Sequence, residues 1–559
     1  MTDRQADIIG LIHKEVKPAL GCTEPIAVAL AVAKAVDIIS ENCSHCGDCP
    51  LWRQTADFRI AVEVSGNILK NGMGVGIPGT GMVGLPIAAA LGAVCGDAAK
   101  GLEVLQGVSS SAVARAKELV AGRRVAISVA DIDRLLYVKA TVTMGHGVEA
   151  SAEVNPHAYA VIEDDHDKIV ETSFADRILM SSESGAAVKD RTTLDYKLSV
   201  REIYDFACTA DFEDIEFILD DRTLNLALAK EGLDGDYGLR VGKAIRENQL
   251  EVFGDDFMSF AMGLTAAASD ARMAGCTLPA MSNSGSGNQG ITVSMPIIAY
   301  ALKYGIADEP LARALILSNL VAIHIKGYLG KLSALCGCVV ASTGSACGIV
   351  YLQGGTYEQV CAAIKNMIGN ITGMVCDGAK VGCAMKVASG VSSAIQSAVL
   401  ALRGTCIPST DGIIEDDIEK TVLYFGGWYH VSKYSVEALC DALRMELKPF
   451  GIDVSMIEPG GIQTNWGLIA ADHLAESSKG TPYEAEGLRE AETMRKAYSM
   501  RLLSKPAVVA RAISKAVNSR RPRARYRVGF GAHTLVFLHT ILPARWWDAL
   551  FRLGGKIKF

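Results

Sequence analysis

Long hydrophobic runs are missing from this 559-residue chain. The longest, such as "AHTLVFLHTILPA", is shorter than the roughly 20 apolar residues that a membrane-spanning helix needs. The opening segment, "MTDRQADIIGLIHKEVKPAL", carries charges throughout, unlike a secretion signal. We therefore expect a cytoplasmic protein that has no membrane partner.

An excess of positive charge is also missing. The chain holds 55 Lys and Arg residues against 62 Asp and Glu residues, and this net charge of −7 gives no case for binding nucleic acid. Hydrophobic residues make up 50% of the chain and charged residues 21%, as in a well-packed globular enzyme. The length exceeds what one hydrophobic core holds, so we expect several domains.

The charge balance changes near residue 420. Residues 1–420 hold 35 Lys and Arg against 50 Asp and Glu, a net charge of −15, and residues 421–559 hold 20 against 12, a net charge of +8. This asymmetry predicts two units of different origin.

The first of these units is predicted to be α+β. Apolar and polar residues alternate at 58–64 and 136–144, and again in "VEASAEV" and "HAYAVIE", which is the pattern of half-buried strands. After about residue 195 the pattern becomes helical, in segments such as "SFAMGLTAAASDARMAG" and "GVSSAIQSAVLALRG". We predict a mixed α/β region over 1–195 and a mainly α-helical domain over 196–422.

The segment "GCTEP" opens the apolar stretch "IAVALAVAKAV". Thr23 can cap a helix here, and Pro25 suits its first turn. Cys22 then lies at a helix N-terminus, where the helix dipole favours a thiolate and lowers the thiol pKa. A buried cysteine beside a helix cap is an equally weighted alternative.

The glycine-rich segment at residues 65–81, "SGNILKNGMGVGIPGTG", follows a predicted strand. Residues 74–79 formally match a dinucleotide-binding pattern, but a proline inside the turn disagrees with that interpretation. A loop that holds a small anionic substrate fits better. Asn67, Lys70 and Asn71 are carboxylate-binding types, and backbone N–H groups between glycines can bind an anion.

A second glycine-rich segment, "SNSGSGNQG" at residues 282–290, offers hydroxyl and amide donors on a flexible backbone. Its composition excludes a place in the core, so a solvated loop is the one serious alternative to a binding loop.

The chain has 15 cysteines, and in a reducing compartment metal binding or catalysis explains them better than disulfides do. "LSALCGC" contributes Cys336 and Cys338, and "GMVCDGAKVGCAMK" contributes Cys376 and Cys383. Three thiolates on loops between helices can hold a [4Fe-4S] cluster whose fourth iron is open as a Lewis acid. A structural zinc ion bound by the same four cysteines is the alternative.

Six motifs in order, "GCTEP", "SGNILKNG", "GIPGTG", "SGSGNQG", "KLSALCGC" and "MVCDGAKVGCAMK", resemble the L-cysteine desulfidase family of the serine-dehydratase alpha-chain superfamily. The resemblance covers about residues 5–420. It implies conversion of L-cysteine and water to pyruvate, ammonia and hydrogen sulfide at an oxygen-labile [4Fe-4S] cluster. L-serine dehydration by the same residues is the close alternative.

The resemblance also implies residue roles. The cluster ligands map to Cys376, Cys383 and one cysteine of the CGC pair, for which we predict Cys336 over Cys338. Cys22 maps to the acid–base residue, and the predicted catalytic set is Cys22, Glu24 and Lys70. The predicted contacts to the substrate, L-cysteine, are Thr23, Ser65, Asn67, Asn71, Ser284, Ser286 and Asn288. The sequence leaves open whether the protein forms a homodimer.

One segment departs from the family pattern. "ENCSHCGDCPLW" places Cys43, Cys46 and Cys49 in a CxxCxxCP run, where a plain helix-to-strand connection is expected. Because a fourth cysteine is missing nearby, a peripheral zinc ion or exposed thiols are favoured over a second cluster.

Residues 424–540 resemble the later half of a short-chain dehydrogenase. Tyr429 and Lys433 match its YxxxK pair, and "EPGGIQT" matches the loop that contacts the nicotinamide. The Gly-rich unit that binds the nucleotide is missing. We therefore predict a partial Rossmann-like α/β segment over 423–559 that binds no NAD(P), and an oxidoreductase is the least favoured function.

Overall fold

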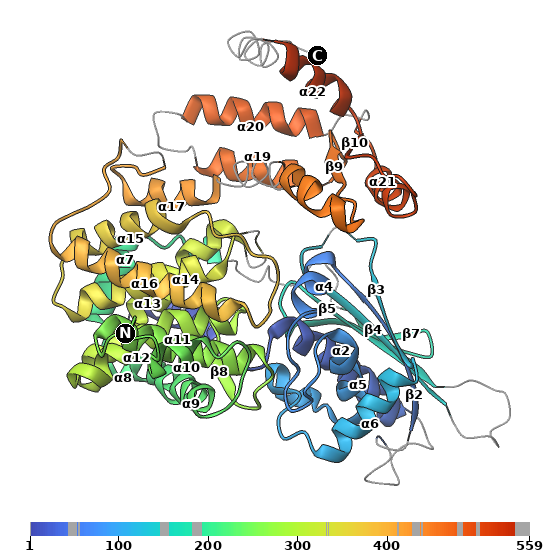
Figure 1. Ribbon diagram of the computed structural model, residues 1–559, viewed down its shortest axis with the longest axis horizontal. Helices are drawn as coiled ribbons and strands as arrows, with labels where there is room; N and C mark the ends of the chain where they lie inside the picture. Colours follow the sequence, from blue (N-terminus) through green and yellow to red (C-terminus); the bar gives the residue numbers. More distant parts are fainter. Residues whose placement is uncertain are drawn as a thin grey trace. The chain divides into compact units, whose positions relative to one another are not determined.

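The computed structural model describes residues 2–42, 53, 56–132, 134–145, 156–181, 193–330, 333, 335–410, 413–427, 437, 440–464, 466–477, 484–498 and 503–542. The chain divides into two compact units, which we call unit 1 (Met1–Tyr429) and unit 2 (His430–Phe559). Figure 1 shows the sheet and helices of unit 1 and the smaller set of helices in unit 2. The mixture of helices and sheet confirms the predicted α+β class.

Unit 1 contains a six-stranded sheet in the order β3-β2-β4-β5-β6-β7. β2 is parallel to β3, and the other neighbouring strands are antiparallel. Every second residue of β2 is buried, which confirms the alternation predicted there, whereas "VEASAEV" lies outside the described residues. The strands are β2 (Asp57–Val64), β3 (Val125–Val129), β4 (Tyr137–Gly145), β5 (His157–Glu163), β6 (Ile169–Phe174) and β7 (Arg177–Ser181).

Two alanine-rich helices, α2 (Thr23–Asn42) and α5 (Leu85–Cys95), share a hydrophobic core with the sheet. They approach closely at Gly92, where a side chain would meet the Ala29 carbonyl oxygen at 2.4 Å. Shorter helices complete this region: α4 (Gly66–Gly72), η1 (Ala98–Glu103) and α6 (Ser110–Ala121).

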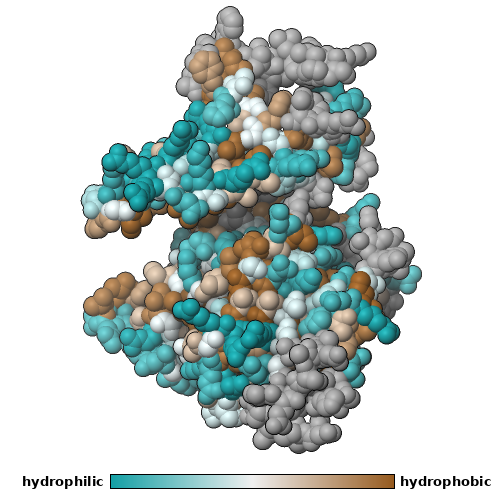
Figure 2. Space-filling view, turned by 90° about the vertical axis from the view of Figure 1, so that its right-hand side faces the viewer, coloured by the Kyte–Doolittle hydropathy of each residue, from teal (hydrophilic) through white to brown (hydrophobic). Residues whose placement is uncertain are grey.

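Some apolar side chains are exposed on the surface of the protein. Figure 2 shows hydrophilic and hydrophobic residues interspersed on the face that it displays. Exposed apolar side chains of the sheet region include Val129, Leu135 and Ile178. The homodimer stays a prediction.

The second part of unit 1 is a helical bundle. Its central helices α13 and α14 are buried over most of their length, because small residues let them pack closely. At Gly344, for example, a side chain would meet the Ser318 carbonyl oxygen at 2.3 Å. The helices are α7 (Val200–Thr209), α8 (Phe212–Ile215), η3 (Glu216–Leu219), α9 (Asp220–Asp234), α10 (Val241–Glu247), α11 (Phe257–Met273), α12 (Gly287–Tyr304), α13 (Asp308–Leu329), α14 (Gly337–Leu352), α15 (Tyr357–Ile371), α16 (Cys383–Leu402) and α17 (Ile418–Gly427), with η2 (Thr193–Tyr196) before them.

The N-terminal residues join the two parts of unit 1. Helix α1 (Asp3–Glu15) contributes Ile8, Leu11 and Ile12 to the core of the bundle. Strand β1 (Pro18–Leu20) then pairs antiparallel with β8 (Pro279–Met281). This pairing places "GCTEP" beside the "SNSGSGNQG" segment.

Helix α16 is long and apolar enough to cross a membrane by length and composition. It packs against α11, α14 and α15, and about half of its most apolar stretch is buried. A core helix passes the same test, so this feature is weak evidence for a membrane span.

Unit 2 contains a two-stranded parallel sheet of β9 (Met456–Pro459) and β10 (Arg525–Val528). β9 ends inside the "EPGGIQT" motif, at Pro459, whereas Tyr429 and Lys433 lie outside the described residues. The helices are η4 (Lys448–Phe450), α19 (Trp466–Ser477), α20 (Glu484–Tyr498), α21 (Ala507–Val517) and α22 (Ala532–Ile541).

Candidate functional site

The "GCTEP" segment turns into α2 through Gly21, whose φ of +74° is in the left-handed region that favours glycine. The thiol of Cys22 donates a hydrogen bond to Glu24 Oε2 at 3.2 Å. The side-chain amide of Asn71 donates to the other carboxylate oxygen, Oε1, at 2.8 Å. The predicted residues Cys22, Glu24 and Asn71 therefore form one buried group.

The negative charge of this group is on Glu24. Burial opposes that charge, but the charge of His166 and the hydrogen bonds from Cys22 and Asn71 hold the pKa of Glu24 below its usual value. Burial, followed by the charge of Glu24, raises the pKa of Cys22, and nearby Arg272 offsets only part of the effect. The prediction that Cys22 has a lowered pKa is therefore wrong for the ligand-free protein. Burial and the charge of Glu24 raise the thiol pKa by more than the helix dipole lowers it.

Thr23 does not act through the predicted cap. Its hydroxyl donates to the carbonyl oxygen of Gly285 at 2.7 Å, which ties the start of α2 to the "SGSGN" loop. Pro25 lies in the first turn of α2, as predicted.

The segment at 65–81 is not one loop, because residues 66–72 form helix α4. The first residues of the segment form hydrogen bonds with Leu135, shortly before β4. Ser65 Oγ donates to the Leu135 carbonyl oxygen at 2.9 Å, and Asn67 Nδ2 donates to the same oxygen at 3.4 Å. Lys70 is exposed, and its backbone carbonyl lies against Gly378 of the "CDGAK" loop. The structure thus places α4 between the Glu24 group and the cysteine loops.

The "SGSGN" residues have three different local partners. Ser284 donates to Asn283 Oδ1 at 2.9 Å inside a buried amide network, so the prediction that this segment has no place in the core is wrong. Ser286 caps α12 by accepting a hydrogen bond from the Gln289 backbone N–H. Asn288 Oδ1 accepts a hydrogen bond from Arg272 Nη1 at 3.2 Å. Only Asn288 of these three bonds to a charged side chain.

The cysteine loops meet through a short antiparallel bridge between Leu335 and Val375. The backbone N–H of Cys336 donates to the Met374 carbonyl oxygen at 2.9 Å, and Cys383 begins α16. The charges of Cys336 and Cys376 both act on the Cys383 thiol and help to raise its pKa, after burial, which is the largest cause.

The two cysteines of the CGC pair differ. The thiol of Cys338 donates to the Lys386 carbonyl oxygen at 2.9 Å and is fully buried, and its pKa is raised by its interaction with Cys336 and by burial. The interaction with Cys338, a backbone N–H and the Lys386 and Lys326 cations lower the pKa of Cys336. Cys336 is thus the member of the pair that favours the thiolate.

The donor set can be compared with the two metal groups considered. Among the described residues, no three His, Cys, Asp or Glu side chains converge so that they could hold a single metal ion. A zinc ion needs such a common point. Each cysteine ligand of a [4Fe-4S] cluster binds a different iron atom, so the thiol chemistry of Cys336, Cys376 and Cys383 is compatible with that group, and the cluster stays a prediction. The CxxCxxCP run at 43–49 lies outside the described residues.

Sequence reasoning missed four charged residues around this site. Arg272, Lys326 and His166 are buried, and burial lowers the pKa of Lys326 to about 8. Asp377 is more exposed; burial opposes its charge, but hydrogen bonds from Lys380 and Lys386 hold its pKa at about 2. The signal was present for two of them, because "AAASDARMAG" and "VAIHIKGYLG" each place a charge inside an apolar helical stretch.

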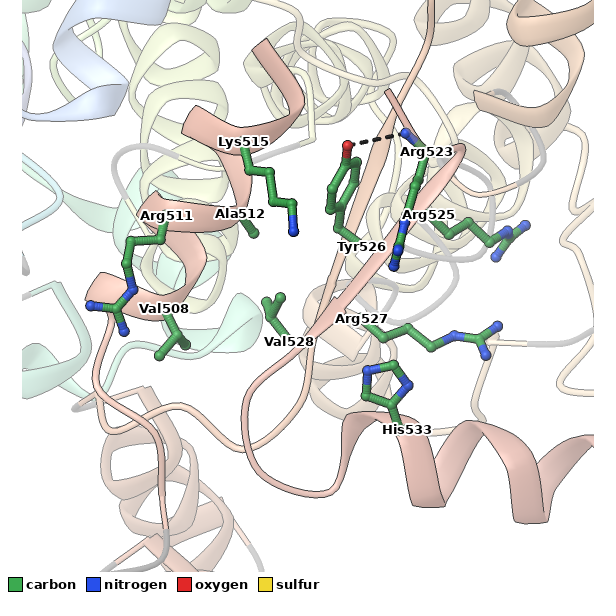
Figure 3. A pocket seen from close by; sticks show the side chains of 10 residues that line it. All are labelled: Val508, Arg511, Ala512, Lys515, Arg523, Arg525, Tyr526, Arg527, Val528 and His533. Carbon is green, nitrogen blue, oxygen red and sulfur yellow. Dashed lines mark hydrogen bonds between the residues drawn. The ribbon is translucent and has the colours of Figure 1, made fainter. Parts of the chain in front are cut away.

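Unit 2 has a separate cavity of about 500 Å³ between α21, β10 and α22 (Figure 3). Arg525 is already paired with Glu437, Asp441 and Glu458. The lining is strongly basic and contains none of the predicted site residues: Val508, Arg511, Ala512, Lys515, Arg523, Arg525, Tyr526, Arg527, Val528 and His533.

Comparisons with known proteins address unit 1. The sequence profile of the serine dehydratase alpha chain family matches residues 99–431. A UPF0597 protein of Oleidesulfovibrio alaskensis is 51% identical over 413 residues, which cover 74% of this chain and 91% of the relative. UPF0597 proteins of Bacteroides fragilis (46% over 419 residues) and Shewanella halifaxensis (45% over 417 residues) each cover 74% of this chain and 92% of their own length.

The family match ends at residue 431, so the short-chain-dehydrogenase resemblance of unit 2 stays a prediction. For unit 1 the profile and the relatives agree with the superfamily that the motifs indicated. The chain belongs to the serine dehydratase alpha chain family, which indicates a lyase-type enzyme.

Proposed function

We propose that the protein is an L-cysteine desulfidase, which converts L-cysteine and water to pyruvate, ammonia and hydrogen sulfide. The observation that carries the proposal is the contact between two groups of residues. Cys22, bonded to the buried carboxylate of Glu24, packs in one cluster with Val75 and Met273, and Cys383 lies against that cluster. A proton-transfer pair thus lies beside a predicted cluster ligand.

The pair can supply the base for elimination. In the resting state the proton is on Cys22 and the charge is on Glu24. Transfer of the thiol proton to Glu24 along the hydrogen bond leaves a thiolate, and this thiolate takes the proton from the substrate Cα.

As the Cα proton leaves, the Cβ–S bond breaks and sulfide departs with the bonding electron pair. The remaining aminoacrylate takes up a proton and hydrolyses to pyruvate and ammonia. Asn71 keeps Glu24 oriented toward Cys22 throughout, because it bonds to the other carboxylate oxygen.

Cys336, Cys376 and Cys383 are the residues that would hold a [4Fe-4S] cluster. When bound, the cluster supplies an open iron as a Lewis acid for the leaving sulfide. Lys326 and Lys386 support the assignment of Cys336 over Cys338, since both cations favour its thiolate. L-serine dehydration by the same residues is the alternative that the family description favours.

The test is purification without oxygen, followed by iron and sulfide analysis and by two assays. Sulfide release from L-cysteine is compared with pyruvate release from L-serine at equal concentrations. We expect about four irons per chain, a colour that bleaches in air, and faster turnover of L-cysteine. An active, colourless protein that contains zinc would contradict the proposal, and faster turnover of L-serine would favour the alternative.

A further inference from the structure

Arg272 is a buried cation with unused hydrogen-bonding capacity. It lies in the last turn of α11, and only 2% of the residue is exposed. Its Nη1 donates to Asn288 Oδ1 at 3.2 Å, while Nε and Nη2 are buried and have no hydrogen-bond partner. Among the described residues, no carboxylate accepts a hydrogen bond from Nε or Nη2.

Such an arrangement is costly, because burial removes water from the guanidinium and nothing replaces it on two of its three nitrogens. Arginine presents parallel N–H groups that match a carboxylate in bidentate fashion. An anionic ligand would therefore restore the missing hydrogen bonds and the missing charge together.

The surroundings of Arg272 specify where the ligand would lie. The guanidinium lies against Gly287, the first residue of α12, where a side chain would meet Nε at 2.2 Å. The N-terminus of this 18-residue helix adds a favourable field for an anion. The charge of Arg272 also acts on Cys22, so the ligand would lie near the proposed base.

We propose that Arg272 binds the α-carboxylate of the amino-acid substrate, a role that rests on the proposed function of this site. With its carboxylate held at Arg272, the substrate presents its Cα–H close to Cys22. Neutralising the carboxylate also makes the Cα proton more acidic, since less negative charge opposes its removal.

Gly287 is explained by the same contact. A methyl group at this position would occupy the space of the guanidinium, so Gly287→Ala must move the end of the Arg272 side chain. The end of a long side chain can move without loss of the fold. Gly287→Ala therefore tests the position of the cation, whereas Arg272→Met tests the charge.

The first experiment measures binding without turnover. L-alanine has no β leaving group, so calorimetry on the anaerobic full-length protein can compare it with L-alaninamide, which lacks the carboxylate. We expect wild type to bind L-alanine at least about 100-fold more tightly than the amide. Arg272→Met and Gly287→Ala should lose this preference, and Arg272→Lys should keep part of it.

The matched control is Arg246→Met. Arg246 lies on α10, packs on Gly263 of the same α11, and its side chain is 32% exposed. The control should bind L-alanine as wild type does, because it removes an arginine of α10 that packs on α11 without touching the proposed site.

The second experiment separates this role from a structural one. The ratio of kcat/KM for L-cysteine to that for its methyl ester should fall about 100-fold in Arg272→Met, mainly through KM. An equal loss for both substrates would show a structural role and overturn the inference. Tight binding of inorganic phosphate at the site in place of L-alanine would also overturn it. If wild type binds L-alanine but has no activity on L-cysteine, the proposed function fails and the carboxylate site stands.

Discussion

Unit 1 and unit 2 differ in how deeply their charged side chains are buried. In unit 1, Glu24, Asp221, Arg272 and Lys326 are almost completely buried among apolar helices. In the described part of unit 2, some charged side chains form ion pairs at or near the surface, as Arg525 does with three carboxylates. Burial of an ionisable group costs free energy, so the buried charges of Glu24, Arg272 and Lys326 mark a candidate functional site.

The hydrophobic core is also larger in unit 1 than in the described part of unit 2. The described part of unit 2 has a small core cluster of Ala471, Ala475 and Ala491, while unit 1 has two extensive clusters. Few fully buried residues mean little apolar area removed from water, and therefore a lower free energy of unfolding. We thus expect activity and most of the stability to reside in unit 1.

The largest effect should come from the cysteine loops. Cys376→Ser and Cys383→Ser should each abolish iron binding and sulfide release, because a hydroxyl is a poor iron ligand. Iron analysis and the anaerobic sulfide assay measure both. Cys440→Ser in unit 2 is the matched control and should keep both. Full iron content in the Cys383→Ser variant would show that another residue is the ligand.

A smaller but still large effect is expected at the base. Cys22→Ala and Glu24→Gln should retain the wild-type iron content and lose about 10²–10⁴-fold in kcat. A loss of turnover without a loss of iron would distinguish a base from a cluster ligand, because a base moves a proton and does not hold the metal. Near-normal turnover of Cys22→Ala would contradict the base assignment.

An intermediate effect concerns stability and pH. Burial raises the pKa of Asp221 to about 7, so the folded state keeps a proton that the unfolded chain has lost above its usual pKa. Stability should therefore fall as pH rises from about 4 to 7. Asp221→Asn should remove this slope and stabilise unit 1 by roughly 2–4 kcal/mol at pH 8, with little gain at pH 4.

Thermal unfolding at the two pH values checks this expectation. Asp472→Asn in unit 2 is the control, since Asp472 is exposed and pairs with Arg495 at the surface. It should change stability by less than about 1 kcal/mol at either pH. A flat pH profile in wild type would refute the role of Asp221.

The smallest effect on activity should follow from removal of unit 2. A chain that ends at Tyr429 should keep sulfide release within about twofold, since every predicted site residue precedes that position. Calorimetry of the full chain should show two transitions, with unit 2 unfolding first. Micromolar binding of NADH or NADPH by the full chain, measured by fluorescence, would instead assign unit 2 a cofactor.

Local rules account for what the sequence predicted well. Alternation predicted β2, β4 and β5 because a half-buried strand imposes a period of two. Pro25 and the alanine-rich stretch predicted α2 from its first turn. The six ordered motifs indicated the superfamily of unit 1, which the comparisons support.

The rest depends on tertiary contacts that local rules do not contain. The helix dipole suggested a thiolate at Cys22, but its environment is set by burial and by the hydrogen bond to Glu24. Helix α4 formed where a glycine-rich loop was expected, because residues 66–72 can continue an i to i+4 pattern before Gly74. The role of Arg272 depends on a tertiary contact, because the end of α11 places its guanidinium against Gly287 at the start of α12.

The pairing of β1 with β8 has a consequence for the order in which the protein is made. Thr23 and Gly285, which are 262 positions apart, hydrogen-bond to one another, and both flank strands of only three residues. During synthesis, the "GCTEP" segment therefore cannot take its final place until the "SNSGSGNQG" segment has been made. Closing so long a loop is entropically slow, so this closure is expected late in folding. A nascent chain that has not yet reached Gly285 cannot close this loop, because it lacks the partner of Thr23.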